Sequence, residues 1–291
     1  MSTHDPLVPD WHTISLPDTW PDQLDFSRPA AWLRLFGHAS GLKRSPVRLP
    51  DDMPGRDLIP RYVLQEFHNL PNGNYSHHIT RGYISSFNRV MLGHIGRSHQ
   101  RIANLLRDCG SVLDVGCGGG GLAGAVKGLG VMDVWGIDPS PYLLRHAALA
   151  WPGVQFVQGI AENTGFSAQR FDAIGACFLL HEIPGKHLHK SLSEFQRILK
   201  PGGLLAICEP SPLQLQLPLF TMLRRWGWQG VYFYLFARKV FDPFVDHWHK
   251  QDVAALLDAH GFELLEDEVG MPMRHILARK RVATSGYDRS K

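Results

Sequence analysis

The stretch that decides the fold is Val112-Leu113-Asp114-Val115-Gly116-Cys117-Gly118-Gly119-Gly120-Gly121. It combines a short apolar strand, an acid inside that strand and a glycine-rich turn that leads into a helix. Glycines allow a sharp turn and a close approach of the backbone to a ligand, because they carry no Cβ. The start of the following helix presents free N–H groups and the positive end of its dipole to that ligand. The stretch therefore predicts a site for a nucleotide-type cofactor.

Two cofactors fit this loop. Gly116-x-Gly118-x-x-Gly121 matches the dinucleotide fingerprint, and Asp138 lies 22 residues after Gly116, where a ribose-binding acid is expected, so NAD is one alternative. Asp114 favours S-adenosylmethionine instead. A carboxylate at this position would repel a pyrophosphate and attract the ammonium of a methionine moiety, directly or through water.

Five segments resemble, in order and spacing, the motifs of class I S-adenosylmethionine-dependent methyltransferases. Within that class the sequence is most similar to the ubiquinone/menaquinone C-methyltransferase-like branch. The segments are the glycine-rich stretch at 112–121, the second strand at 134–140, the third strand at 156–162, the fourth strand at 171–182 and the LKPGG turn at 198–205. The resemblance covers roughly residues 110–280 and implies S-adenosylmethionine as the cofactor and methyl transfer as the reaction.

The resemblance also implies which residues contact the cofactor. Asp138 would accept the ribose hydroxyls, the turn from Gly116 would contact the methionine portion, and Phe178 would lie near the methyl group. The full set expected to bind the cofactor is Asp114, Gly116, Cys117, Gly118, Asp138, Pro139, Ala161, Glu162 and Phe178. One position departs from the family pattern. Many members carry an acid where this chain has Ile160, so the adenine contact must come from backbone or from Glu162, or is absent.

Composition limits the other classes of function. With 291 residues, 44% hydrophobic and 20% charged, the chain predicts a packed globular protein. A net charge of +3 gives no case for nucleic-acid binding. No apolar run approaches the ~20 residues of a membrane span, and the first residues lack the basic start and apolar core of a secretory signal. We therefore expect a cytoplasmic protein, and the oligomeric state is not indicated.

The order of predicted elements gives the fold class. Strands and helices alternate over 110–210, which is typical of a parallel sheet. We predict an α/β fold, a Rossmann-like seven-stranded mostly parallel sheet with helices on both faces and a C-terminal antiparallel hairpin. The predicted divisions are an N-terminal arm at 1–60, an N-terminal helical cap at 61–109, the cofactor-binding domain at 110–280 and a flexible tail at 281–291. The arm holds one predicted helix at 29–39, and the cap one long helix at about 78–107.

An insertion at about 211–247 interrupts this alternation. It is dense in Leu, Phe, Tyr and Trp, with basic residues interspersed. An insertion after the fifth strand commonly forms a substrate lid in this fold, which suggests a hydrophobic substrate or peripheral contact with a membrane surface. The alternative is a subdomain that buries its own aromatic side chains.

The chemistry of methyl transfer indicates the catalytic candidates. The sulfonium is already activated, so the enzyme aligns the two reactants, excludes water and supplies a base if the acceptor is a phenol or a ring carbon. His181 is the first candidate base because it follows the fourth strand, and Glu182 would orient it or act as the base itself. The alternative role for His181 is to cap the next helix. Tyr75 and His78 are candidates to contact the acceptor, and a solvated helix start is the alternative.

We expect no metal. The pairs His187-x-His189 and Asp246-His247-x-His249 offer ligands but lack the tight multi-ligand spacing of a structural zinc site. The sequence thus predicts methyl transfer from S-adenosylmethionine to a small or lipid-tailed aromatic acceptor, such as a phenol or quinone precursor, with general-base assistance. The alternatives are an NAD-dependent oxidoreductase, a protein that binds the cofactor without turnover, and transfer of a different group from the same cofactor.

Overall fold

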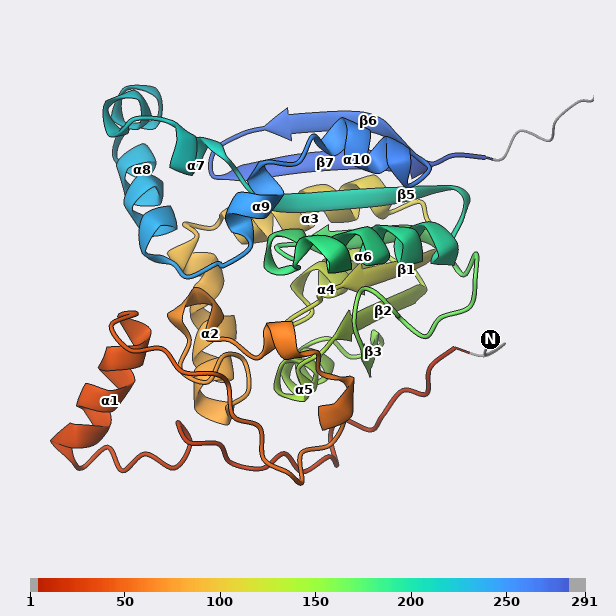
Figure 1. The fold of residues 1–291 in the computed structure, drawn as a ribbon. Helices are drawn as coiled ribbons and strands as arrows, with labels where there is room; N and C mark the ends of the chain where they lie inside the picture. Colours follow the sequence, from red (N-terminus) through yellow and green to blue (C-terminus); the bar gives the residue numbers. More distant parts are fainter. Residues whose placement is uncertain (1–4, 283–291) are drawn as a thin grey trace, which may run out of the picture.

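A seven-stranded mixed sheet forms the centre of the computed structural model, which describes residues 5–282 (Figure 1). The strand order is β3-β2-β1-β4-β5-β7-β6. The first five strands of this order pair in parallel, and β7 is antiparallel to both of its neighbours. The strands are β1 (Ser111–Val115), β2 (Asp133–Asp138), β3 (Gln155–Gln158), β4 (Phe171–Cys177), β5 (Leu199–Pro210), β6 (Phe262–Val269) and β7 (Met273–Lys280). The predicted fold class is confirmed.

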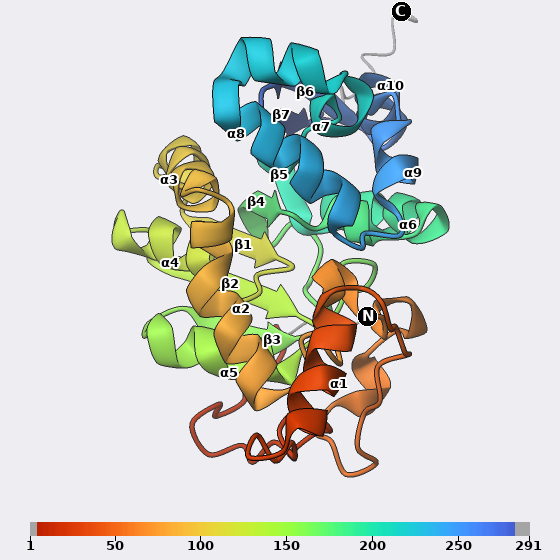
Figure 2. The same ribbon diagram turned by 90° about the vertical axis from the view of Figure 1, so that its left-hand side faces the viewer.

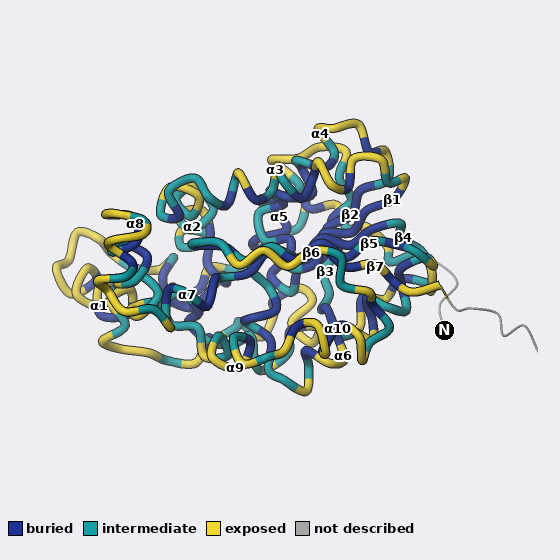
Figure 3. Tube along the Cα trace, turned by 90° about the horizontal axis from the view of Figure 1, so that it is seen from above, coloured by how far each residue is buried: buried dark blue, intermediate teal, exposed yellow. Residues whose placement is uncertain are grey.

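Successive side chains of a strand point to opposite faces of the sheet, which divides the core into two layers, one on each face. In β1, Leu113 and Val115 join one buried cluster, whereas Val112 joins the other. Figure 3 shows the central strands as the most continuously buried part of the chain. The first cluster packs against α6 (Gly185–Ile198) and α10 (Val253–Ala259). The second packs against α3 (His94–Leu106), α4 (Gly121–Gly128) and α5 (Pro141–Ala150).

The single long helix predicted at 78–107 is wrong. Two helices occupy this range, α2 (His77–Val90) and α3, with a break between them. Leu92 and Gly93 have φ values of 50° and 79°, and this left-handed backbone cannot continue a right-handed helix. The apolar spacing continues through the break, which is why the sequence pattern predicts one helix.

The N-terminal arm wraps around the lower part of α2. Its helix α1 (Pro29–Ala39) has the predicted bounds, and in Figure 2 α2 runs between α1 at the bottom and α8 at the top. Three short 3-10 helices follow α1, at Arg56–Leu58, Arg61–Val63 and Phe67–Asn69. The predicted flexible tail lies outside the described residues from position 283 onward.

Asp22 ties the arm to the first turn of α2. Its carboxylate accepts hydrogen bonds from the N–H groups of Thr19, His77 and His78 and from the Ser76 hydroxyl. Burial raises the pKa of this carboxyl, but the donated hydrogen bonds outweigh it and lower the pKa to about 2. Because the folded-state pKa is depressed, the ionised carboxylate stabilises the fold above its ordinary pKa of 3.8, and this contribution is lost as the pH falls toward 2.

We expect Asp22→Ala to lower the free energy of unfolding at neutral pH by about 2 kcal/mol, the energy of a pKa shift of this size. Urea unfolding measures the loss, which should shrink as the pH is lowered through the acid range. Asp18→Ala is the matched control, because the Asp18 side chain is 67% exposed and lies 3.8 Å from His77. Equal losses in the two variants would contradict the role given to Asp22.

The insertion at 211–247 folds as three helices beside the carboxyl ends of the strands. They are α7 (Leu213–Gln216), α8 (Leu219–Lys239) and α9 (Val245–His249). α8 bends at Gly227, whose φ is 57°, so that Phe233 is buried while Phe220 and Trp228 remain exposed. Within residues 5–282, no helix combines the length and the apolar character needed to cross a bilayer.

Candidate functional site

The glycine-rich loop leaves the carboxyl end of β1 and turns back beside β2. The N–H groups of Gly116 and Cys117 both donate to the Ile137 carbonyl oxygen, at 2.9 and 3.0 Å. Gly116 and Gly118 have φ values of 67° and 52°, in the left-handed region that favours glycine. A Cβ on Gly118 would meet no described atom within 4 Å, so this part of the loop is open to a ligand.

Asp138 holds the loop from the end of β2. Its carboxylate accepts a hydrogen bond from the Gly118 N–H at 3.0 Å and another from the Ser140 N–H at 2.8 Å. Burial raises the pKa of Asp138 to about 7, although both hydrogen bonds act in the opposite direction. The carboxyl group therefore titrates near neutral pH.

A cavity of about 690 Å³ lies in front of the loop. Five of the residues predicted to bind the cofactor line it, namely Gly116, Cys117, Gly118, Asp138 and Phe178. Glu182, a predicted catalytic residue, also lines it. Helices α2 and α3 contribute further lining, including Tyr83, Phe87 and His99. The structure thus brings together the residues predicted to surround the ribose and methionine portions.

Four predicted cofactor residues do not line this cavity: Asp114, Pro139, Ala161 and Glu162. Asp114 lies beneath the loop, 2% exposed, and accepts a hydrogen bond from the Ala123 N–H at 3.0 Å. Burial raises its pKa to about 8. This hydrogen bond joins β1 to α4.

Glu162 contacts two side chains of the protein, Tyr62 and His187. Its Oε1 accepts a hydrogen bond from the Tyr62 hydroxyl at 2.9 Å and lies 2.6 Å from Nδ1 of His187. Burial and the neighbouring Glu162 raise the pKa of Tyr62, so the phenol remains a donor. The adjacent Ala161 is 6% exposed and belongs to the core. The adenine contacts of Ala161 and Glu162 stay predictions.

A second cavity, of about 650 Å³, adjoins the first. Tyr83, Phe87 and Phe178 line both cavities and form a common aromatic wall. Phe178 has a φ of 58°, and its N–H donates to the Cys208 carbonyl oxygen at 2.8 Å, which fixes the backbone as it leaves β4. The rest of the lining is mainly apolar and comes from α2 and the insertion, including Ile79, Val90, Met91, Leu215, Phe236, Val240 and Val245.

The two predicted acceptor contacts separate in the structure. His78 lines the second cavity, where its Nδ1 lies 3.0 Å from the Asp22 carboxylate. Tyr75 is 3% exposed and packs in a core cluster with Leu16 and Tyr142 instead. The structure therefore brings His78, but not Tyr75, to this cavity.

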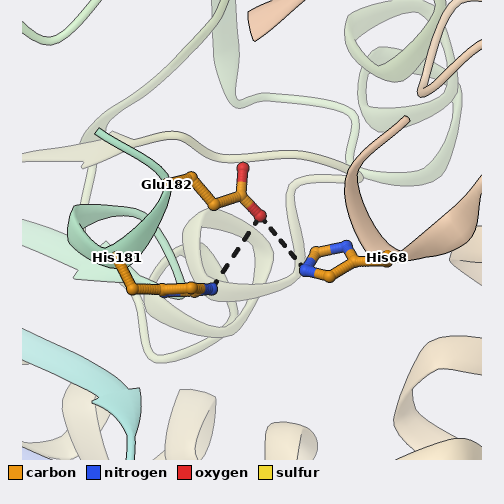
Figure 4. A group of neighbouring side chains, drawn as sticks. All are labelled: His68, His181 and Glu182. Atoms are coloured by element: carbon orange, nitrogen blue, oxygen red, sulfur yellow. Dashed lines mark ion pairs between the residues drawn. The ribbon is translucent and has the colours of Figure 1, made fainter. Parts of the chain in front are cut away.

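His181 lies behind the cavity walls in the short helix Leu180–Glu182. Its ring is fully buried, and Nδ1 lies 2.6 Å from the fully buried Glu209 carboxylate at the end of β5. Burial alone would lower the pKa of His181, but the charge of Glu209 raises it to about 9. Figure 4 shows Nε2 of this ring directed toward Glu182, beside His68.

Three residues close to His181 and Glu182 were not predicted from the sequence: His68, Glu209 and Asp242. His68 and Asp242 lie in irregular segments with no periodic signal, and the fold alone brings them to the end of β4. Glu209 could have been predicted, because it lies at the carboxyl end of an apolar parallel strand. Ligands bind at this end of the strands in this fold class.

A parallel sheet with a glycine-rich turn after β1 and an acid at the end of β2 defines a Rossmann-like cofactor-binding domain. Residues 87–267, more than half of the chain, match the family described as "Methyltransferase domain". The chain belongs to this family. The match supports the resemblance to class I methyltransferases over the alternative of an NAD-dependent oxidoreductase.

Named relatives support the branch resemblance. The chain is 36% identical over 99 residues to a demethylmenaquinone methyltransferase of Chlorobaculum parvum, covering 34% of this chain and 40% of that protein. It is 32% identical over 122 residues to a phthiotriol/phenolphthiotriol dimycocerosates methyltransferase of Mycobacterium leprae, covering 41% and 44%. The chain spans about half the length of the curated relatives it matches. A solved Pyrococcus horikoshii protein is similar with a TM-score of 0.49 and 22% identity, covering 65% of this chain and 92% of that one.

Proposed function

We propose that this protein transfers the methyl group of S-adenosylmethionine to a hydrophobic aromatic acceptor, such as a phenolic lipid or a quinone precursor. The observation that carries the proposal is the aromatic wall of Tyr83, Phe87 and Phe178 between the two cavities. A cavity of 650 Å³ with a mainly apolar lining suits an acceptor of drug-like size or larger. The names of the relatives, which refer to menaquinone and to phenolic lipids, agree with this class.

The reaction proposed is an in-line displacement at the methyl carbon. An electron pair on the acceptor oxygen or ring carbon forms the new bond to the methyl group. The S–CH3 bond breaks, and its pair returns to sulfur, which leaves S-adenosylhomocysteine. The acceptor loses one proton to a base. The two adjoining cavities would hold the reactants side by side and exclude water, which is the main contribution an enzyme makes to this step.

Glu182 is the better candidate for the base. Of the two predicted catalytic residues, it lines the cofactor cavity, whereas His181 is fully buried and lines neither cavity. A base must come within hydrogen-bond reach of the proton that it removes. We therefore infer that Glu182 receives the acceptor proton and that His181 is a positioning residue, held by Glu209.

Calorimetric titration with S-adenosylhomocysteine and with NADH tests the cofactor. We expect binding of the first alone. Incubation with methyl-labelled S-adenosylmethionine and a panel of phenolic and quinol acceptors with short and long tails then tests the acceptor class. The proposed acceptor class would be overturned if the protein binds S-adenosylhomocysteine and methylates a polar acceptor but transfers no label to any aromatic acceptor.

Gly82 allows the second cavity to be blocked without touching the first. It lies in α2, lines only the second cavity of the two, and a Cβ there would meet no described atom within 4 Å. We expect Gly82→Phe to raise KM for the acceptor by about 10-fold or more, the effect of filling part of an apolar pocket. The Kd for S-adenosylhomocysteine should stay within about twofold.

Gly82→Ala is the matched control, because it also replaces the helix-disfavouring glycine in α2 but adds only one methyl group. Its KM should equal that of the wild type. A rise in Kd for S-adenosylhomocysteine with an unchanged acceptor KM would show that the roles of the two cavities had been assigned wrongly.

A further inference from the structure

Four side chains from three distant segments meet where the two cavities adjoin. His68 comes from the short helix Phe67–Asn69, His181 and Glu182 from the turn after β4, and Asp242 from the loop after α8. Nε2 of His68 lies 3.2 Å from Glu182 Oε1 and 3.2 Å from Asp242 Oδ1. Nε2 of His181 lies 4.0 Å from the same Glu182 oxygen (Figure 4).

These atoms are close together without being aligned for hydrogen bonds. Among residues 5–282, Nε2 of His181 and Oδ1 of Asp242 are buried and have no hydrogen-bond partner, and the His181 side chain is 0% exposed. Leaving such buried polar groups unpaired is unfavourable. Polar atoms that approach one another but do not point at one another are expected when all of them point at a shared central atom.

The surroundings orient the two imidazole rings. Glu209 accepts from Nδ1 of His181 and leaves Nε2 as the ring nitrogen that faces the group, and a carboxylate behind a histidine is the usual arrangement behind a metal ligand. The His68 ring stacks with Tyr83, at 6.0 Å between ring centres. The His68 backbone has a φ of 56°, an uncommon value for a residue other than glycine, and its N–H donates to the Phe241 carbonyl oxygen beside Asp242.

We propose that this group binds one divalent transition-metal cation through Nε2 of His68, Nε2 of His181 and Oε1 of Glu182, with Asp242 as a neighbouring carboxylate. Neighbouring ligands of a tetrahedral Zn²⁺, with bonds of ~2.0–2.1 Å, stand about 3.3 Å apart. Glu182 Oε1 lies 3.2 Å from Nε2 of His68 and 4.0 Å from Nε2 of His181, and the three ligand atoms all lie within 4.8 Å of one another. Imidazole with carboxylate is a donor set for Zn²⁺, Mn²⁺ or Fe²⁺, and the two carboxylates balance the charge of the ion.

The position of the group suggests what the cation does, and this part rests on the proposed function. Glu182 lines the cofactor cavity, whereas His68 and Asp242 line the acceptor cavity. A cation held by three protein ligands keeps a fourth position open for the acceptor oxygen, beside the place of the methyl group. Coordination lowers the pKa of a bound hydroxyl and positions its oxygen. The acceptor would therefore carry an oxygen that can bind the cation at or beside the methylated atom, as a phenol or a quinol does.

Metal titration of the whole chain tests the site without cofactor or acceptor. The protein is treated with EDTA, exchanged into metal-free buffer and titrated separately with Zn²⁺, Mn²⁺ and, under anaerobic conditions, Fe²⁺. After gel filtration, mass spectrometry of the elements should find about one ion per chain for at least one metal. His68→Ala should weaken that binding by ~100-fold or more, since losing even an outer-shell partner such as Asp242 costs 10–100-fold.

The double variant His189→Ala/His260→Ala is the matched control. Nδ1 of His189 lies 3.0 Å from Nε2 of His260 at the surface, and a pair of histidines so close could also capture an ion. Retention of the ion by this variant and its loss from His68→Ala supports the site, with circular dichroism confirming that both variants are folded. No retained ion in the wild type, or equal retention in all variants, overturns it. Neither result decides whether methyl transfer occurs, because S-adenosylhomocysteine binding and label transfer are measured separately.

Discussion

Replacing Glu209 with alanine is expected to lower the free energy of unfolding by about 3–5 kcal/mol, the cost of removing one partner from a buried ion pair. The carboxylate is fully buried and accepts hydrogen bonds from the N–H groups of Leu179, Leu180 and His181. It also accepts from Nδ1 of His181 at 2.6 Å. Alanine would leave four donors without a partner in a region that water does not reach.

Urea unfolding at neutral pH measures this loss, read from the midpoint at an unchanged slope. Glu209→Gln keeps the volume and one accepting oxygen, so its loss should be smaller, about 1–3 kcal/mol. Glu268→Ala is the control, because Glu268 is 61% exposed and pairs with Arg101 at the surface, where such pairs contribute about 1 kcal/mol or less. A loss for Glu209→Ala no greater than that of the control would contradict the stabilising role.

The second large effect concerns cofactor affinity. We expect Asp138→Ala to raise the Kd for S-adenosylhomocysteine by about 10–100-fold, which corresponds to losing charge-assisted hydrogen bonds worth ~1.5–3 kcal/mol. The ionised carboxylate would accept both ribose hydroxyls. Because burial raises its pKa to about 7, the carboxyl group is largely protonated below that pH and accepts less well.

The affinity of the wild type should therefore depend on pH. Kd should fall as the pH rises through 7, by up to ~10-fold per unit below the pKa, and then level off above it. Calorimetry over pH 5.5 to 8.5 measures the profile. Asp138→Asn should give a flat profile, whereas Asp133→Asn, at the other end of β2, should keep the slope. A flat profile in the wild type would remove Asp138 from the ribose role.

The cofactor-binding half of this protein follows from local sequence features. The stretch around Gly116–Gly118 predicted a strand, a turn and a helix, and the structure has them in β1, the loop and α4. The bounds of α1 equal the predicted ones. Such elements are predictable because side-chain periodicity and the backbone freedom of glycine act within a few residues of one another.

Much of the second cavity and of the group beside it was decided by tertiary structure. The break at Leu92–Gly93 separates α2 from α3 although the apolar pattern continues through it. The group of His68, Glu182 and Asp242 joins residues far apart in the chain, and Glu209 orients His181 from another strand. No local pattern encodes such contacts, because they depend on where the sheet, α2 and the insertion place their ends in space. The sequence thus determined the class of protein and its glycine-rich loop, and the packing of distant segments decided which side chains meet where the two cavities adjoin.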